Sequence, residues 1–156
     1  MKPLCIYPGN CADGFGAAWA VWKFFKGEVD FHAGVYQSPP PDVTDRQLFI
    51  VDFSYKYDVL VEMSYKALNT TILDHHKTAA EDLGRLPFFK TGAEGTNHGR
   101  EAAKFECYSQ NMPDIAACFD MERSGAGLTW DYFFPNDPRP KLINHIEDRD
   151  LWRFAL

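Results

Sequence analysis

The sequence lacks an excess of positive charge and any long apolar run. Its 156 residues carry 16 lysine and arginine side chains against 22 aspartate and glutamate side chains, a net charge of −6. A surface of that sign does not attract long duplex nucleic acid, so a polyanionic partner would need a local basic patch or bound cations. No apolar stretch approaches the ~20 residues of a membrane span, so we expect no membrane partner.

Cysteine motifs are also missing. The four cysteines (Cys5, Cys11, Cys107 and Cys118) have no CxxC spacing, which disfavours a structural zinc site or a disulfide framework. Three of them lie in or beside apolar runs, as reduced thiols of a cytoplasmic protein do. The start, "MKPLCIYPGN", enters a strand-like run without signal-peptide architecture. Both features favour a cytoplasmic location.

The composition that is present is that of a globular domain. Hydrophobic residues make up 46% of the chain and aromatic residues 15%. At this length we expect one domain over residues 1–156, with a core large enough to need no disulfide or metal for stability. There are no internal repeats and no low-complexity tracts.

Apolar runs and helical spacing alternate along the chain. Apolar runs predict strands near 4–7, 47–52, 69–73 and 114–119, and an alternating pattern predicts one near 29–33. Helical spacing predicts helices over 12–27, 56–68, 78–86, 124–134 and 138–152. Between 88 and 113 the pattern weakens, and we interpret this stretch as a polar insertion. The alternation predicts an α/β fold, a doubly wound and mostly parallel sheet with helices on both faces.

Polar side chains follow the ends of these strands. Asp52 ends the third predicted strand, Asp74, His75 and His76 end the fourth, and Asp13 follows the first. Ligands of parallel sheets bind beyond the carboxyl ends of the strands, so we expect these five side chains to meet in one crevice.

Carboxylates and imidazoles together suit Mn²⁺, Fe²⁺ or Zn²⁺, and such centres commonly activate water and polarise phosphoryl oxygens. Lys77, Arg123 and Arg149 are candidates to hold phosphate oxygens of a substrate. A single aspartate at a strand end is more often a turn former or helix cap, and Asp13 alone fits a cap. From the residues, a metal-dependent hydrolase and an α/β domain with a polar crevice both stay open.

Four blocks extend the pattern in one order over residues 4–154. They are "GNCADGFGAAWAVW", "IVDFS", "LDHHK", and a last region made of "DMERSGAGLTWDYFFP" and "HIEDRDLW". In these blocks the chain resembles the DHH phosphoesterase superfamily, named for the triplet found here as Asp74-His75-His76. It is similar to the N-terminal domain of oligoribonuclease-like and RecJ-like members.

The resemblance implies roles for single residues. Asp13, Asp52 and His75 match metal ligands of the family, with Asp52 as the bridge between two metals. Asp148 matches the metal ligand of the fourth region, and Asp150 is the competing candidate.

Asp74 and His76 match the structural and phosphate-side members of the triplet. Together with Asp52 they form the catalytic set that the resemblance implies.

Two departures from the family pattern affect these expectations. Pro8 and Cys11 stand where the first motif carries a histidine and an aspartate, so the first metal site should be weakened. The C-terminal substrate domain of the family has no counterpart in these residues, which makes the chain either a fragment or a stand-alone domain.

The resemblance implies a phosphoesterase that uses Mn²⁺, or another divalent ion such as Mg²⁺, Fe²⁺ or Co²⁺. Its expected reaction is hydrolysis of phosphodiester bonds by metal-activated water, and its expected partners are phosphorylated small molecules, cyclic dinucleotides or short oligonucleotides. Two alternatives remain, namely a degenerate module that binds nucleotide or metal without catalysis, and a pyrophosphatase-like hydrolase. The oligomeric state is not determined by the sequence.

Overall fold

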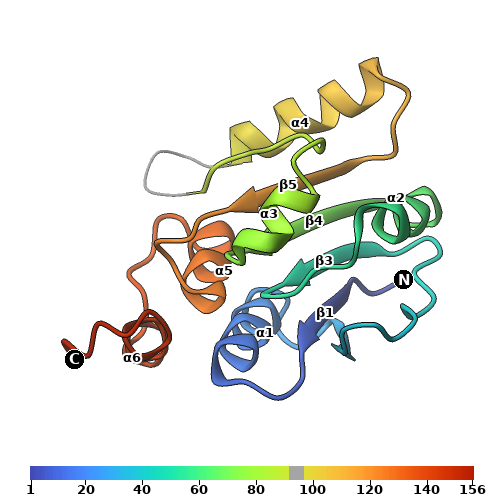
Figure 1. The fold of residues 1–156 in the computed structure, drawn as a ribbon. Helices are drawn as coiled ribbons and strands as arrows, with labels where there is room; N and C mark the ends of the chain where they lie inside the picture. Colours follow the sequence, from blue (N-terminus) through green and yellow to red (C-terminus); the bar gives the residue numbers. More distant parts are fainter. Residues whose placement is uncertain (92–96) are drawn as a thin grey trace.

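Five parallel strands form one sheet in the order β2-β1-β3-β4-β5 (Figure 1). The structure, a computed structural model, describes residues 1–91 and 97–156, with side chains described for 1–91 and 99–156. The strands are β1 (Leu4–Pro8), β2 (Asp30–Gly34), β3 (Gln47–Val51), β4 (Asn69–Asp74) and β5 (Ile115–Phe119). The predicted α/β class with a parallel sheet is confirmed.

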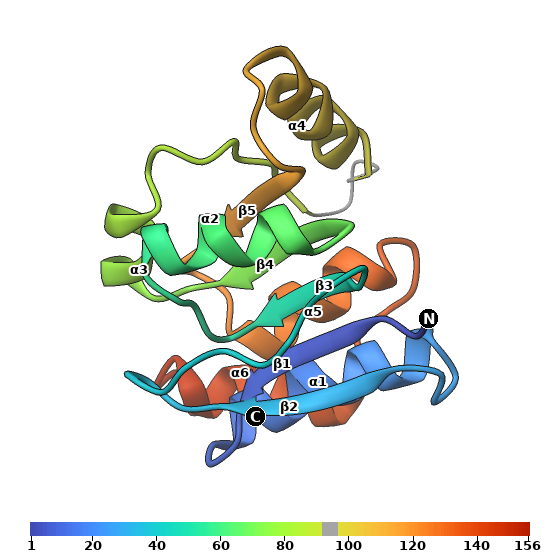
Figure 2. The same cartoon turned by 90° about the vertical axis from the view of Figure 1, so that its right-hand side faces the viewer.

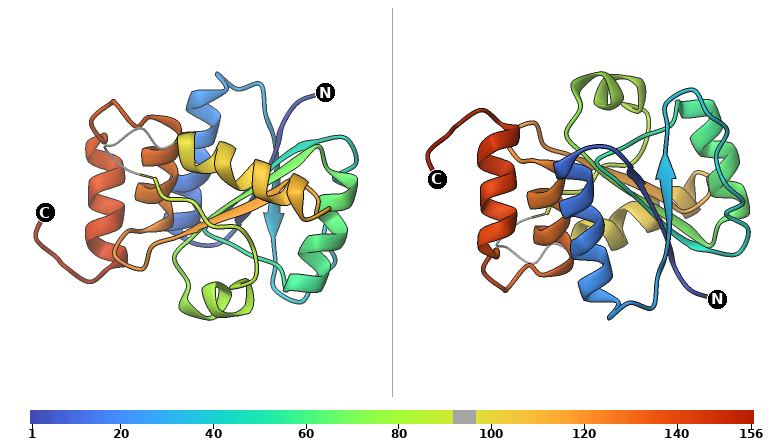
Figure 3. Two further views of the ribbon diagram at one scale, coloured as in Figure 1. Left: turned by 90° about the horizontal axis from the view of Figure 1, so that it is seen from above. Right: turned by 90° about the horizontal axis from the view of Figure 1, so that it is seen from below.

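The helices in the described residues are α1 (Ala12–Phe24), α2 (Tyr57–Lys66), α3 (Lys77–Asp82), α4 (Asn97–Ser109), α5 (Gly125–Phe133) and α6 (Lys141–Asp150). Along the chain, α1 to α4 lie between strands, and α5 and α6 follow the last strand. Seen along the sheet, α1, α5 and α6 lie next to one another on one side and α2 on the other (Figure 3). Among the described residues, no helix is both long and apolar enough to cross a membrane.

The central strands β3 and β4 are buried on both faces. Ile50 and Ile72 belong to a cluster that Leu60 of α2 completes. Their neighbours Phe49 and Leu73 point to the opposite face, into a cluster with residues of α1 and α5. Burial on both faces explains why the apolar part of β3, "LFIV", is continuous rather than alternating.

Small residues bring α1 close to α5 and α6. A Cβ atom on Gly16 would lie 2.9 Å from the Cβ of Ala126 in α5 and 2.8 Å from the Cδ1 of Ile146 in α6. Only glycine fits between these two side chains without a shift of the helices. This contact matters for function because it sets the first turn of α1 against the beginning of α5.

The predicted polar insertion over 88–113 is wrong in part, because α4 occupies Asn97–Ser109; residues 92–96 lie outside the described part (Figure 2). Ala103 and Cys107 of α4 are buried in the core. Arg100, also buried, binds Asp114 at 2.8 Å and so joins α4 to the start of β5. The buried face of α4 carries small residues, so the helical spacing of apolar side chains is weak in this part of the sequence.

The direction in which the chain adds strands changes at β1. From β1 the chain first moves to β2 at one edge, and then crosses back to β3 on the other side of β1. The carboxyl ends of β1 and β3 therefore border a crevice where the connections diverge, the usual ligand position in open parallel sheets.

The two-sided core generates a stability prediction. Replacement of Ile50, fully buried in β3, by alanine should lower the free energy of unfolding by about 2–5 kcal/mol, since it leaves a cavity between the sheet and α2. The matched control is Leu68→Ala, because Leu68 is 63% exposed and its truncation should change the value by less than about 0.5 kcal/mol. Urea unfolding followed by circular dichroism measures both, and equal losses would contradict the assigned core.

Candidate metal centre

One imidazole nitrogen faces three carboxylates at the carboxyl ends of the strands. The Nε2 atom of His75 lies 2.9 Å from Oδ1 of Asp52 and 3.1 Å from Oδ2 of Asp13. An Oδ2 atom of Asp150, from the end of α6, lies 3.8 Å away. A single nitrogen cannot bond fully to three carboxylates at once. The predicted convergence of Asp13, Asp52 and His75 is confirmed.

The carboxylate of Asp13 is held by the first turn of α5. Its Oδ2 accepts the N–H of Gly125 at 2.9 Å and its Oδ1 accepts the N–H of Ala126 at 2.8 Å. Free N–H groups at a helix N-terminus favour a negative charge. Burial acts to raise the pKa of Asp13, but the hydrogen bonds from His75 and from these two N–H groups outweigh it and lower that pKa.

Asp52 follows β3 in a left-handed backbone conformation, with φ at 52°. A Cβ atom on Gly125 would lie 2.5 Å from the Cβ of Asp52, so only glycine lets α5 begin this close to the strand end. Burial raises the pKa of Asp52 to about 6, against the hydrogen bond from His75 and together with the charge of Asp13.

The same two carboxylates control the charge of His75. Burial by itself would lower the pKa of the imidazole, but the hydrogen bonds to Asp13 and Asp52, and then their negative charges, raise it to about 10. In the absence of a metal ion, the His75 ring is therefore protonated at neutral pH.

Asp74 lies fully buried behind the histidines. Its Oδ1 accepts the backbone N–H of His75 at 2.8 Å and lies 2.6 Å from Nδ1 of His76. That hydrogen bond is the main cause of a raised pKa of His76. The other oxygen, Oδ2, is buried without a hydrogen-bond partner among the described residues. Buried unpartnered carboxylate oxygens are costly, and a cation is one way to satisfy them.

Two sets of ligand atoms have the spacing that a metal ion requires. One atom from each of Asp52, Asp74, His75 and His76 lies within 4.8 Å of the others, and the same holds for Asp13, His75 and Asp150. Among the described side chains, neither lysine nor arginine forms an ion pair with these carboxylates. The donor types, the surplus of negative charge and the unpartnered Oδ2 fit a divalent cation.

The expectation that Asp148 joins this group is wrong, and Asp150 takes the place. The carboxylate of Asp148 instead accepts the N–H groups of Ala155 at 2.7 Å and Leu156 at 3.3 Å. Two positions along a helix are about 200° apart around its axis, so the two aspartates cannot share a face. Asp148 fastens the segment after α6, whereas Asp150 faces His75.

The three basic candidates are placed differently. Arg123 donates to Asp120, to Asp131 and to the carbonyl of Thr91, so its donors already serve the loop between β5 and α5. We therefore withdraw Arg123 as a phosphate ligand.

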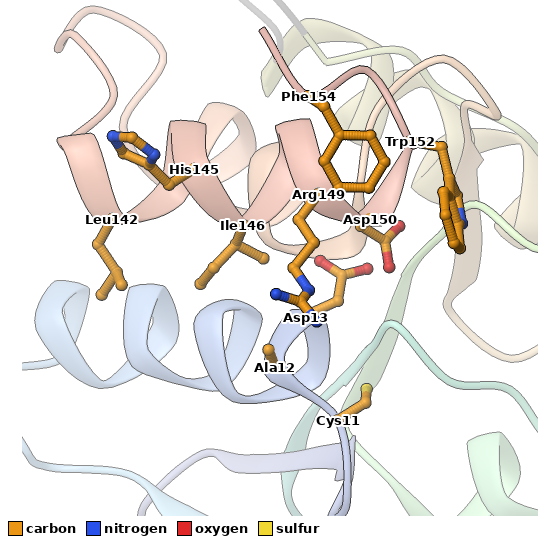
Figure 4. Close-up of a pocket in the computed structure, with 10 residues that line it drawn as sticks. All are labelled: Cys11, Ala12, Asp13, Leu142, His145, Ile146, Arg149, Asp150, Trp152 and Phe154. Carbon is orange, nitrogen blue, oxygen red and sulfur yellow. The ribbon is translucent and has the colours of Figure 1, made fainter. Parts of the chain in front are cut away.

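Arg149 lines a cavity of about 600 Å³ between α1 and α6, together with Cys11, Asp13 and Asp150 (Figure 4). Its side chain is exposed, and within the described ranges it has no salt-bridge partner. Lys77, at the first position of α3, is exposed as well. Both remain candidates for contact with a substrate anion.

Sequence reasoning missed how α6 is attached to the site. Glu147, buried in α6, accepts the N–H of Ser124 at 2.9 Å through Oε1 and pairs with Arg139 at 2.5 Å through Oε2. Ser124 is the N-cap of α5 and accepts the N–H of Gly127. In the sequence, a serine directly before "GAG" is the feature that could have predicted this helix cap. Since Glu147 binds the α5 cap, it also sets where Asp150 lies.

Cys11 lies beside the cluster. Its sulfur accepts the N–H of Gly14 at 3.2 Å, as the N-cap of α1, and lies 3.5 Å from Oδ2 of Asp52. Burial, and then the charge of Asp52, raise the pKa of this thiol. Without a metal ion, the thiol is thus the neutral neighbour of the carboxylates.

The chain is similar to an uncharacterized protein of Acanthamoeba polyphaga mimivirus, with 31% identity over 169 aligned residues. The alignment covers 98% of this chain and 34% of the viral protein, so the chain spans about a third of the length of that relative. No family model matches the sequence, and no solved structure matches it. The viral relative carries no stated activity.

The charge of His75 generates a prediction for the metal-free protein. Its pKa is about 10 when folded and about 6.5 when unfolded, so its stabilising effect is complete below pH 6.5 and disappears as pH rises through 10. With a chelator present, wild type should be more stable than His75→Gln at pH 6.5, and this difference should shrink toward pH 10. Urea unfolding at several pH values tests it, and a constant difference would contradict the assigned ion pairs.

Proposed function

We propose that this chain is a divalent-metal-dependent phosphoesterase of the DHH type. The observation that carries the proposal is the convergence of Asp13, Asp52 and Asp150 on one nitrogen of His75, at the point where the strand connections diverge. Such a concentration of carboxylates needs a cation, and hydrolysis of phosphate esters is a common use of carboxylate and imidazole metal centres. The resemblance in the four sequence blocks supports the same assignment.

The residues divide between two neighbouring positions. Asp13, His75 and Asp150 would hold one ion, and Asp52 and Asp74 would hold a second. A bound ion of the Mn²⁺ type would lower the pKa of water and polarise a phosphoryl oxygen. The proposal includes Mg²⁺, Fe²⁺ and Co²⁺, since their ligand preferences overlap.

The protein groups around the ions have separate tasks. Arg149 is free to bind the non-bridging phosphate oxygens, and Asp52 would hold the ion that activates the attacking water. His76 is oriented by Asp74 through the 2.6 Å hydrogen bond and is raised in pKa, so it donates a hydrogen bond to the substrate. Arg149 and His76 would thereby stabilise the negative charge that develops on the phosphate oxygens during the reaction.

Cavities on two sides of the cluster favour a phosphodiester over pyrophosphate. Asp13 and Asp150 line the cavity of about 600 Å³, and His76 lines another of about 780 Å³. A phosphodiester carries a substituent on each side of phosphorus, as short oligonucleotides and cyclic dinucleotides do, whereas pyrophosphate would leave both spaces empty. The net negative charge of the chain also disfavours binding of long duplex nucleic acid. We include a cytoplasmic location in this proposal.

A non-catalytic module is the second candidate, and Cys11 is the observation that favours it. The thiol stands beside Asp52 where the family pattern has a carboxylate, and Pro8 offers no side-chain ligand. Hard ions such as Mn²⁺ prefer carboxylate to thiol, so one of the two positions should bind weakly.

The main test compares ligand replacements on metal binding and turnover. Asp150→Asn and Asp52→Asn should each weaken Mn²⁺ binding by on the order of 10- to 100-fold or more and reduce hydrolysis of a 5′-phosphorylated diadenosine dinucleotide in parallel. Asp58→Asn, at an exposed position of α2, is the matched control and should change neither. Titration calorimetry and chromatographic product analysis measure the two quantities.

Two results would count against the proposal. Mn²⁺ binding that survives Asp150→Asn would remove this residue from the site, and wild-type protein loaded with Mn²⁺ that cleaves no phosphodiester would favour the non-catalytic module. Release of phosphate from pyrophosphate alone would favour the pyrophosphatase-like alternative.

The altered first motif generates its own prediction. Replacement of Cys11 by aspartate should raise the number of bound Mn²⁺ ions from about one to about two per chain, because a carboxylate then adjoins Asp52. Cys11→Ser, which adds no charge, is the control and should leave the number unchanged. If the wild type takes up two Mn²⁺ ions with similar affinity, Pro8 and Cys11 weaken neither of the two ion positions.

A further inference from the structure

A second cavity adjoins the cluster on the side away from α6. It encloses about 780 Å³ between the segment after β2, the start of α2 and the helix α3. Its walls include Tyr36, Phe53, Tyr55 and Lys56, and His76 forms the end nearest the carboxylates. A cavity of this size takes a ligand the size of a nucleoside.

Two stacked aromatic rings, with a third ring edge-on to them, form an aromatic platform in this cavity. The ring of Tyr36 lies on that of Phe53 at 4.7 Å between centroids and 30° between planes, and Tyr55 meets Phe53 edge-on at 5.1 Å. Phe53 is buried at 1% exposure, and a Cβ on Gly34 would lie 3.0 Å from its ring. The ring of Phe53 is therefore fixed by packing, whereas Tyr36 is 60% exposed and available for contact with a ligand.

Tyr36 and His76 connect this platform to the proposed reaction site. The imidazole of His76 lines the cavity while its Nδ1 atom bonds to Asp74. Burial raises the pKa of the Tyr36 hydroxyl, and the charges of Asp74 and Asp52 raise it further, so the phenol lies within the field of the carboxylate cluster. Tyr36 and His76 line the same cavity, so one nucleotide-sized ligand can contact both.

We infer that this cavity binds the base of a nucleotide substrate, with the base stacked on Tyr36 and the attached phosphate at the His76 end. The inference rests on the proposed function, and it adds a binding site for the base and the residue, Tyr36, that contacts it. Stacking on an aromatic side chain accepts any base, because every base has a planar face. Gln37, Ser38 and Thr78 also line the cavity and supply polar groups for the base edges.

The chemistry of the walls favours a base over an aliphatic or peptide ligand. The exposed ring of Tyr36 offers a flat face, and polar side chains at its border suit the edges of a heterocycle. Lys56 contributes a positive charge at the wall. The carboxylate of Asp82, which also lines the cavity, already accepts the N–H of Tyr57 at 3.0 Å.

The test measures how much the base adds to the affinity of the sugar phosphate. In buffer with Mn²⁺, titration calorimetry compares adenosine 5′-monophosphate with ribose 5-phosphate, which lacks only the base. Wild type should bind the nucleotide at least about 10-fold more tightly. Tyr36→Leu should abolish this preference and leave the affinity for ribose 5-phosphate unchanged, whereas Tyr36→Phe should keep most of the preference because the ring remains.

Control measurements distinguish the loss of a base contact from a general effect of the substitution. Tyr65→Leu, an equally exposed tyrosine on α2 at 67% exposure, should behave as wild type. Thermal unfolding checks that Tyr36→Leu is folded, and its intact affinity for ribose 5-phosphate is a second check. The inference is overturned if wild type binds the nucleotide no more tightly than ribose 5-phosphate, or not at all, or if Tyr36→Leu keeps the preference.

Failure of this inference differs from failure of the proposed function. A protein that cleaves phosphodiesters but shows no preference for the base keeps its proposed function and loses the base site. A protein that prefers the nucleotide through Tyr36 but cleaves nothing keeps the base site and is a binding module.

Discussion

The site depends on the balance of negative charge around His75. Asp13 and Asp52 are buried side by side, and without a positive group between them their repulsion would oppose folding. In the metal-free protein a proton on His75 fills that position, and the two N–H groups at the start of α5 bind Asp13 from the other side. A metal ion would replace the proton as the positive charge, so one arrangement serves folding and ligand binding.

Close approach of helices makes this balance possible. Gly125 allows α5 to begin against Asp52, and Gly16 allows α1 to lie against α5 and α6. Glu147 then ties α6 to the N-cap of α5, which sets the place of Asp150. The sheet supplies Asp52, Asp74 and the histidines, while three helices packed on one side supply the remaining groups. Substitution at any of these contacts should therefore affect the carboxylate cluster even at positions that touch no ligand.

Much of the framework could be predicted from local patterns. Apolar runs, and for β2 an alternating pattern, located all five strands to within one residue at each end. The signal is strongest for the central strands, because both of their faces are buried. The polar triplet after β4 located the site for a related reason, since two histidines at the end of a buried strand require partners. The helix α4 was missed because its buried positions, such as Ala103 and Cys107, are small and separated by charged residues.

The sequence by itself determined the parallel α/β fold and the residues at the strand ends, because apolar periodicity and chain order decide where strands and their ends lie. Only the tertiary structure decided which side chains beyond those ends complete the site. Asp148 and Asp150 differ by two positions and are chemically identical, and the orientation of α6 alone selects Asp150. Likewise, Arg123 is engaged with Asp120 and Asp131, whereas Arg149 faces the cavity. Such choices depend on distances between segments far apart in the chain, which no local pattern records.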